Sequence, residues 1–182
     1  ASLLEPFSCV VNGIRVSRIE LGDTVVIYGA GPIGLLHAML SGIAGSGKLV
    51  MVDPLPDRLD RARAFGCDVV LNPARDDVAD RLRHETDGRG ADVVITACPV
   101  AEVQTQAVHL LAPFGRLCLF GGLPKTAGPV ALDTNAIHYG NFVVTGSTGG
   151  SVQDYRIALR LVAGKRVDLT RIISDTFPMA EL

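Results

Sequence analysis

The chain contains 182 residues, of which 48% are hydrophobic and 20 are glycine, and its formal net charge is −2. This length favours a single domain with a sizeable core, and the glycine content is typical of an α/β protein with many short turns. The chain has no excess of positive charge that would indicate a surface for nucleic acid or for an anionic membrane. No apolar run approaches the roughly 20 residues that span a bilayer.

The cysteines and histidines show no metal-binding motif. The four cysteines are spread along the chain without a CxxC pair, and the four histidines lack metal-ligand spacing. Reduced cysteines are typical of cytoplasmic proteins. The first ten residues, ASLLEPFSCV, lack the basic region and the long apolar stretch of a signal peptide, so we expect a cytoplasmic protein.

The chain begins with a predicted helix, strand and helix. Apolar residues at helical spacing indicate a helix over 5–19, an apolar β-branched run indicates a strand over 24–28, and a second helix follows over 32–44. The strand and the second helix are joined within the run VVIYGAGPIG. Three glycines in this order, after a strand and before a helix, predict a dinucleotide-binding turn.

Each residue of this turn has an expected role. Gly29 allows a sharp turn out of the strand, Gly31 leaves room for a pyrophosphate, and Gly34 lets the helix pack close to the strand. Pro32 stands at the first helical position, where a missing N–H costs little. The free amides near Ile33 and Gly34 would then face the phosphates at the positive end of the helix. Glycines that only shape a tight turn are the simpler alternative.

The second strand, over 48–52, ends in an acid that indicates the cofactor. Asp53 follows the sequence KLVMV and lies 19 residues after Gly34. At this spacing we expect its carboxylate to accept hydrogen bonds from the adenosine ribose and to repel a 2′-phosphate, which favours NAD over NADP. Asp53 could instead cap the helix after Pro54. Arg58, in that helix, would either flank the adenine or be solvated.

The rest of the chain continues to alternate between strands and helices. Helices are predicted over 56–65, 75–86, 102–111, 133–139 and 151–163, with strands over 68–71, 91–96, 116–120 and 141–146. The tail, 168–182, is expected to form one more turn of helix and an incomplete strand. We therefore predict one dinucleotide-binding domain over 1–182.

The predicted fold class is α/β, with a doubly wound, six-stranded parallel sheet of the Rossmann type and the strand order 3-2-1-4-5-6. Near-continuous apolar strands indicate a sheet buried on both faces, and alternation with helices indicates right-handed crossovers. Ligands of such sheets bind at the carboxyl ends of the strands. Further cofactor contacts are therefore expected at Ala97, Cys98, Gly121, Gly122, Leu123, Thr145, Gly146 and Ser147.

With these elements placed, the chain resembles the nucleotide-binding domain of the zinc-containing medium-chain alcohol dehydrogenases. The resemblance rests on LLEPFSC, LGDTVVIYGAGPIG, VDPLPDRLDRARAFGCDVVLNP, GRGADVVITACP, GRLCLFGGLPK, DTNAIHY and VVTGS, and it extends over essentially all 182 residues. It is strongest toward the polyol (sorbitol-type) and threonine-type dehydrogenases. It implies NAD as cofactor and hydride transfer from a secondary alcohol or polyol.

The resemblance also implies a catalytic zinc whose cysteine and histidine ligands belong to a separate, preceding domain. We therefore expect this chain to be a fragment that does not oxidise alcohols alone. Glu5, in the EP pair, stands where polyol-type members place a glutamate at the zinc, as a ligand or near neighbour. One carboxylate cannot supply the about four ligands that zinc requires, so Glu5 would bind metal only together with the missing domain.

Three other functions remain open at this stage. They are a zinc-free NAD(P)H-dependent quinone or enoyl reductase of the same superfamily, a methyltransferase, and a non-catalytic NAD-binding module. Zinc-free reductases usually carry a small or basic residue where Asp53 stands.

A homo-oligomer is expected, as a dimer or tetramer. The last strand, NFVVTG, would be a sheet edge without a charge or proline to protect it. In the family this edge pairs with its counterpart in a dimer.

Overall fold

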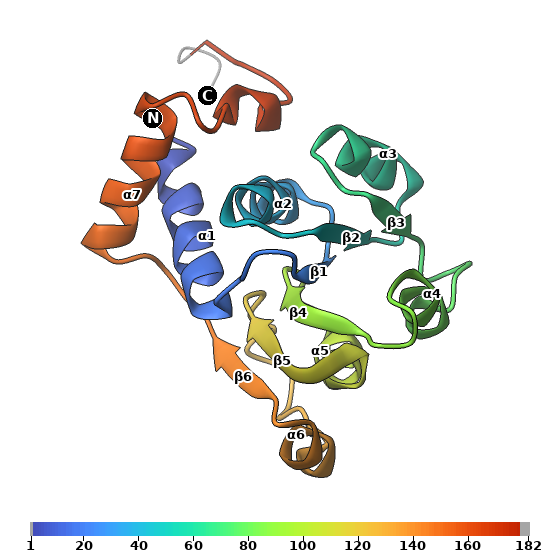
Figure 1. The fold of residues 1–182 in the computed structure, drawn as a ribbon. Coiled ribbons are helices and arrows are strands. Elements are labelled where there is room, and N and C mark those ends of the chain that lie inside the picture. Colours follow the sequence, from blue (N-terminus) through green and yellow to red (C-terminus); the bar gives the residue numbers. More distant parts are fainter. Residues whose placement is uncertain (1, 179–182) are drawn as a thin grey trace.

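The computed structural model describes residues 2–178 and contains one sheet of six parallel strands with helices on both faces (Figure 1). The strand order is β3-β2-β1-β4-β5-β6, which confirms the predicted α/β Rossmann-type topology. The strands are β1 (Thr24–Tyr28), β2 (Lys48–Val52), β3 (Val69–Leu71), β4 (Ala91–Thr96), β5 (Leu111–Leu119) and β6 (Val143–Gly146). The order reverses between β1 and β4, so the carboxyl ends of these two strands flank the switch point where such sheets bind ligands.

The helices form two layers, one on each face of the sheet (Figure 1). The first layer contains α1 (Leu4–Ser17), α2 (Pro32–Ala44), α3 (Pro56–Ala64) and α7 (Val152–Ala163). The second layer contains α4 (Val78–Glu85), α5 (Ala101–Ala107) and α6 (Thr134–Gly140). Short 3-10 turns follow at Val108–Leu110 and Leu169–Ile172.

Side chains of the central strands fill a core on each face of the sheet. Along β1, Val25 and Ile27 join the apolar cluster under the first layer, whereas Val26 and Tyr28 join the cluster under the second. All six residues of β4 are buried. Strands buried on both faces have no polar side to present, which explains why they read as continuous apolar runs in the sequence.

Most predicted boundaries are confirmed to within two residues, but that of α4 is wrong by three. This helix begins at Val78, and not at residue 75, because the Asp77 carboxylate caps it by accepting the Asp80 amide at 2.9 Å. The preceding residues form a turn in which the Asn72 amide donates to the Asp76 carboxylate at 2.7 Å.

Strand β5 begins five residues earlier than predicted, and α5 ends correspondingly early. Leu111 pairs with Ala91, after which the register shifts before Val93 pairs with Arg116. The intervening Phe114 has φ 64° and a side chain that is 71% exposed. The sequence Pro-Phe-Gly therefore forms an irregularity inside a strand that was predicted to begin only after it, at residue 116.

The beginning of β6 and the tail also differ from the prediction. Strand β6 begins at Val143, and not at residue 141, because Asn141 adopts a left-handed conformation, φ 53°, that ends α6. The predicted turn of helix in the tail is present at Leu169–Ile172. The incomplete strand predicted after it is not found over 173–178, and 179–182 lie outside the described residues.

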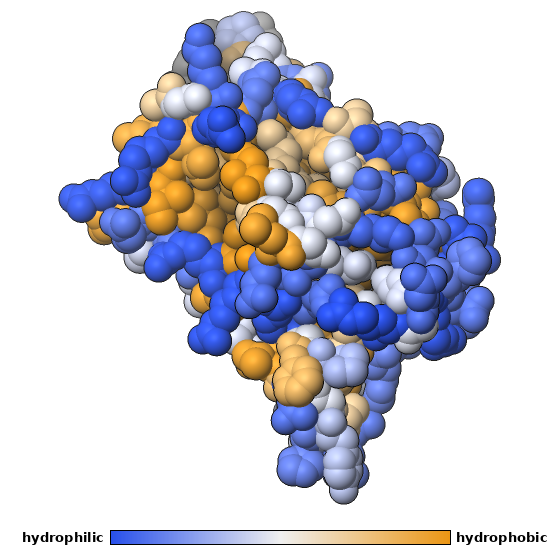
Figure 2. All heavy atoms as spheres, in the orientation of Figure 1, coloured by the Kyte–Doolittle hydropathy of each residue, from blue (hydrophilic) through white to orange (hydrophobic). Residues whose placement is uncertain are grey.

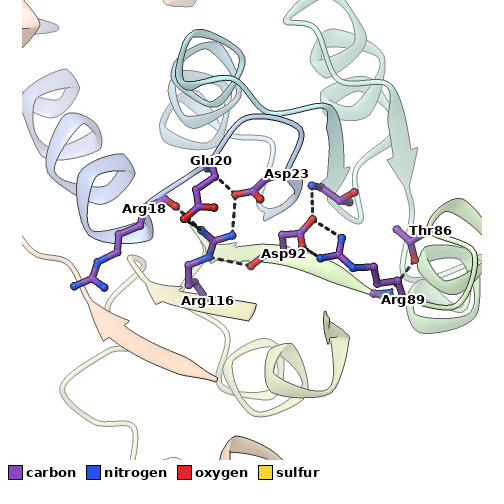
Figure 3. A network of polar contacts seen from close by, with 9 residues as sticks. Arg18, Glu20, Asp23, Thr86, Arg89, Asp92 and Arg116 are labelled. Carbon is purple, nitrogen blue, oxygen red and sulfur yellow. Dashed lines mark hydrogen bonds and ion pairs between the residues drawn. The ribbon is translucent and has the colours of Figure 1, made fainter. Parts of the chain in front are cut away.

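A polar network joins β1, β4 and β5 near the amino ends of β1 and β4 (Figure 3). The Arg116 guanidinium, in β5 just after the register shift, donates to the Asp23 carboxylate at 2.8 Å and to the Arg18 carbonyl oxygen. The Asp92 carboxylate, in β4, accepts the Thr24 amide of β1 at 2.9 Å. Because Asp23 and Arg116 are largely buried, this network fixes the strand ends opposite to those where ligands bind.

The surface combines charged helices with one apolar area. Figure 2 shows apolar side chains gathered over α1 and α7. They line a hollow of about 600 Å³ that includes Leu3, Leu4, Leu159 and Ile173. Over residues 2–178, no helix combines the length and the apolar character needed to cross a membrane.

Candidate cofactor-binding site

The glycine turn after β1 has the geometry that its sequence predicts. Gly29 has φ 102°, and its amide donates to the Val52 carbonyl oxygen at 2.8 Å, which ties the turn to β2. A Cβ at Gly29 would lie 2.9 Å from the Ala97 carbonyl oxygen, and one at Gly34 would collide with the Gly29 carbonyl oxygen. These two glycines are therefore required by backbone packing, whatever the ligand.

Gly31 differs from the other two glycines of the turn. A Cβ added there would meet no atom within 4 Å, and the backbone angles, φ −71° and ψ 180°, are accessible to any residue. Neither sterics nor backbone strain inside the chain calls for glycine at this position. The remaining reason for glycine here is the open space in front of its backbone, where a pyrophosphate would approach.

The amino end of α2 has unpaired capacity for an anion. The helix begins with Pro32, no side chain caps it, and its first turn contains no acidic residue. The first amides of a helix have no acceptor within the helix, and the helix dipole adds partial positive charge there. The amides of Ile33 and Gly34 belong to this first turn, as predicted.

Asp53 is buried at the end of β2, where its carboxylate contacts two backbone segments. One oxygen accepts the Ala30 amide of the glycine turn at 2.8 Å, and the other accepts the Leu55 amide at 2.9 Å. Its side chain is only 3% exposed. The carboxylate therefore shapes both the turn and the start of α3, and each oxygen keeps a lone pair for a further donor.

A crevice of about 710 Å³ opens beside these residues. It brings together Gly29, Gly31, Asp53, Arg58, Ala97 and Cys98, all of which were predicted as cofactor contacts. The Arg58 guanidinium lies 3.7 Å from the Asp53 carboxylate. Burial raises the pKa of the Cys98 thiol, so this thiol is uncharged at neutral pH.

The crevice also has residues that the sequence did not indicate. Its far end is lined by Pro73, Asp76, Val103 and His109, from the segments around α4 and α5. These residues come from loops and helix surfaces whose approach depends on tertiary packing. No local motif marks them.

A second, smaller hollow of about 260 Å³ lies near the amino end of α1. It contains three residues predicted as cofactor or metal contacts: Glu5, Ile33 and Ser147. Its other walls are Pro6, Cys9, Phe120, Thr148 and Gly149, which the sequence did not indicate. The glycine turn and the first turn of α2 connect the crevice to this smaller hollow, since Gly31 lines the crevice and Ile33 lines the smaller hollow.

The remaining predicted residues line neither the crevice nor the smaller hollow. Gly121 is a packing glycine, because a Cβ there would lie 2.6 Å from the Cys98 carbonyl oxygen. The Thr145 hydroxyl donates to the Leu117 carbonyl oxygen at 3.3 Å. Outside the walls of both hollows are Pro32, Gly34, Gly121, Gly122, Leu123, Thr145 and Gly146.

The residues around Glu5 do not by themselves fit a zinc ion. The Cys9 thiol donates to the Glu5 carboxylate at 3.4 Å, and burial, with help from Glu5, raises the pKa of that thiol. A pair of donors falls short of the about four that zinc requires. Within the part of the chain that the structure describes, no three His, Cys, Asp or Glu side chains cluster as a metal site.

Comparison with known proteins identifies the family. The family profile described as zinc-binding dehydrogenase matches residues 32–164, which is well over half of the chain. The chain belongs to this family. This zinc-binding dehydrogenase chain is 31% identical over 182 residues to L-threonine 3-dehydrogenase of Caldanaerobacter subterraneus subsp. tengcongensis, covering 99% of the chain and 52% of that relative. It is also 31% identical to the probable D-xylulose reductase A of Aspergillus clavatus, covering 99% of the chain and 51% of that protein.

Solved structures agree with the fold and the family. A zinc-binding dehydrogenase from Sinorhizobium meliloti 1021, bound to NADP, matches with a TM-score of 0.89 and 29% identity over 95% of this chain and 51% of its own. The alcohol dehydrogenase TADH from Thermus sp. ATN1 matches with a TM-score of 0.85 and 26% identity over 94% of this chain and 50% of its own. The chain thus spans about half the length of the proteins it matches. The predicted resemblance to polyol and threonine dehydrogenases is confirmed, and the methyltransferase alternative is excluded.

Proposed function

We propose that this chain binds NAD(H) for a zinc-dependent alcohol or polyol dehydrogenase. The observation that carries the proposal is the environment of Gly31. The position has no internal reason to be glycine, it faces the crevice, and it precedes an uncapped helix amino end. A pyrophosphate in front of Gly31 would accept hydrogen bonds from the free amides of α2. The adenosine would then lie in the larger crevice, and the nicotinamide would lie toward the smaller hollow.

The preference for NAD over NADP rests on Asp53. Because two backbone amides hold the carboxylate in place, its remaining lone pairs are preorganised for the ribose hydroxyls. A 2′-phosphate would bring a second anion against a buried carboxylate, which is unfavourable.

NADP is the second candidate cofactor, and Arg58 is the observation that favours it. The Arg58 side chain lines the same crevice and is about half exposed, so it is free to turn toward a phosphate. The relative from Sinorhizobium meliloti, which is bound to NADP, gives this alternative some weight.

In the intact enzyme these residues would bind and orient, and the nicotinamide would supply the hydride acceptor. The proposed substrate is a small secondary alcohol or polyol, in line with the names of the two curated relatives. The proposed zinc would need ligands beyond the Glu5 and Cys9 pair, from elsewhere in the intact protein. We therefore expect these 182 residues to bind cofactor without turnover, and alcohol-dependent formation of NADH by this chain would contradict that part.

The proposal includes a cytoplasmic location and a two-fold dimer. The four cysteines are free in the structure, consistent with a reducing compartment. The dimer would form through the outer edge of β6.

The proposal is tested by calorimetric titration of the native chain and of Asp53→Ala with NADH and NADPH. We expect the native chain to bind NADH at least about tenfold more tightly than NADPH, the equivalent of about 1.4 kcal/mol. Asp53→Ala should erase that difference, because it removes both the ribose acceptor and the repelling charge.

Two controls accompany this titration. Asp53→Asn keeps one oxygen acceptor for the backbone amides, so it separates loss of charge from loss of local structure. Thermal unfolding of each variant reports whether the turn remains folded. A native chain that binds both cofactors equally would remove the ribose argument.

A further inference from the structure

A single side chain of α1 holds the loop that follows β6. The Asn12 side-chain amide donates to the Ser147 hydroxyl oxygen at 3.2 Å and to the Gly149 carbonyl oxygen at 3.1 Å. These partners are 135 and 137 residues away in the sequence. Because the Gly149 carbonyl can only accept, the amide group of Asn12 must present its NH₂ to this loop.

Asn12 belongs to the same face of α1 as the walls of the smaller hollow. Glu5, Cys9 and Asn12 follow one another at spacings of four and three residues, which places them along one side of the helix. Glu5 and Cys9 line the hollow, as do Ser147 and Gly149 from the loop. Asn12 therefore joins two walls of one site without lining it.

The rest of the loop is attached to α1 independently of Asn12. Gly150 packs so closely on Ser8 that a Cβ there would lie 2.9 Å from the Ser8 carbonyl oxygen. Further on, the Asp154 carboxylate pairs with Arg15 at 2.5 Å. Loss of the Asn12 amide would thus free the Ser147 hydroxyl and the Gly149 carbonyl while α7 stays docked.

The direction of the hydrogen bond determines what Ser147 can do. Its hydroxyl oxygen accepts from Asn12, so its own proton remains available for another acceptor. Its backbone amide donates to the Leu119 carbonyl oxygen at 3.1 Å, which fixes the residue beside β5. The side chain is therefore a fixed donor at the wall of the smaller hollow.

We propose that Asn12 is a positioning residue for the nicotinamide end of the cofactor. It orients the Ser147 hydroxyl so that the proton is donated to an amide oxygen in the smaller hollow. The carboxamide of nicotinamide is a ligand group with that chemistry. This inference rests on the proposed function, and it assigns Asn12 no contact with the cofactor itself.

The test compares NADH with ADP-ribose, which has the same adenosine and pyrophosphate but no nicotinamide. Asn12→Ala should weaken NADH binding about tenfold, the equivalent of one hydrogen bond in a shielded site. It should leave the affinity for ADP-ribose within about twofold of native. Asn135→Ala, at an exposed position in α6, is the matched control and should change neither.

A second set of variants separates positioning from general stability. Ser147→Ala should weaken NADH binding as much as Asn12→Ala, and the double variant should lose no more than either single one, because both act through one hydrogen bond. The fluorescence of bound NADH should shift in the same variants, since it reports the surroundings of the nicotinamide.

The outcomes distinguish this inference from the proposed function. If Asn12→Ala binds NADH with native affinity, or weakens NADH and ADP-ribose equally, the positioning role is wrong. Additive losses in the double variant would also overturn it. If the native chain binds neither ligand, the proposed function fails as well. If it binds both equally, the nicotinamide is not held and only the further inference fails.

Discussion

His37 is the most completely enclosed titratable residue of the site's surroundings. It lies in α2 with no exposed surface, and its ring packs edge-on against Phe120 with centroids 4.5 Å apart. Neither ring nitrogen has a partner among the described residues. Burial lowers the pKa of His37 to about 3, so the ring is neutral while it supports Phe120, a wall of the smaller hollow.

This burial predicts a pH-dependent stability. Below pH 6.5 the unfolded chain takes up a proton at His37, whereas the folded chain does so only near pH 3. Stability from this residue is therefore complete above pH 6.5 and falls by about 1.4 kcal/mol per unit as the pH drops toward 3. His37→Leu should remove this part of the decline, which urea unfolding at pH 7 and pH 5 would measure.

The comparison of native chain and variant isolates His37 from the carboxylates, which titrate in both. Between pH 7 and pH 5, the unfolding free energy of the native chain should fall by about 2 kcal/mol more than that of His37→Leu. A difference that stays constant over this range would show that the ring is protonated, or exposed to water, in the folded state.

At the residue scale, the sequence predicted which residues form the glycine turn and its acid better than it predicted what those residues contact. The spacing of Gly29, Gly31, Gly34 and Asp53 identified the turn and its acid, because a local motif encodes them. The partners of Asp53 could not be predicted, because the Ala30 amide reaches it only once β1 and β2 pair. The alternative that Asp53 caps the next helix is wrong, because Leu55 is the N-cap of α3 and no side chain caps this helix; Asp53 accepts the Leu55 amide just before the helix begins.

At the scale of elements, β6 leaves one edge of the sheet without a partner among residues 2–178. It pairs on one side with β5, and Val143 is 40% exposed. The Ser147 amide points to β5, so by alternation the amides of Val144 and Gly146 point outward. An edge with free amides and no charged side chain is suited to pairing with another strand.

Pairing of two β6 edges predicts a dimer with a continuous sheet. Sedimentation at tens of micromolar should give twice the 19.2 kDa mass of the chain. Val144→Pro removes an outward amide and should give a monomer, whereas Val152→Thr, at an exposed position in α7, should stay dimeric. A native chain that sediments only as a monomer would contradict the pairing.

Elements defined by local pattern were predicted well, and those defined by tertiary contact were not. The strands before and after the switch point were evident because a strand buried on both faces is apolar over most of its length. The early start of β5 was missed, since residues 111–115 join the sheet across a register shift. Likewise, the contact of Asn12 with the loop after β6 joins segments that share no local signal.

At the scale of the whole molecule, the crevice beside Asp53, the smaller hollow beside Glu5 and the glycine turn all lie at the carboxyl end of the sheet. The crevice beside Asp53 and the hollow beside Glu5 meet at the first turn of α2, so an extended dinucleotide could occupy both. The Arg116 network stabilises the opposite end of the sheet (Figure 3). This division leaves one end of the fold for packing and the other for ligand.

We propose that a pyrophosphate binds in front of Gly31, and one substitution at this position tests the proposal directly. Gly31→Val places a side chain into space that no atom of the chain occupies, at backbone angles that valine adopts readily. The variant should therefore fold as stably as the native chain while losing the cofactor. Gly42→Ala, an exposed helical glycine with equally open surroundings, is the control and should keep native affinity.

The measurement is calorimetric titration of NADH into the three proteins, with thermal unfolding of each. We expect Gly42→Ala to bind NADH with the affinity of the native chain, and a fully folded Gly31→Val to bind it at least about a hundredfold more weakly. A folded Gly31→Val that binds NADH as tightly as the native chain would place the cofactor somewhere else and contradict the proposed function.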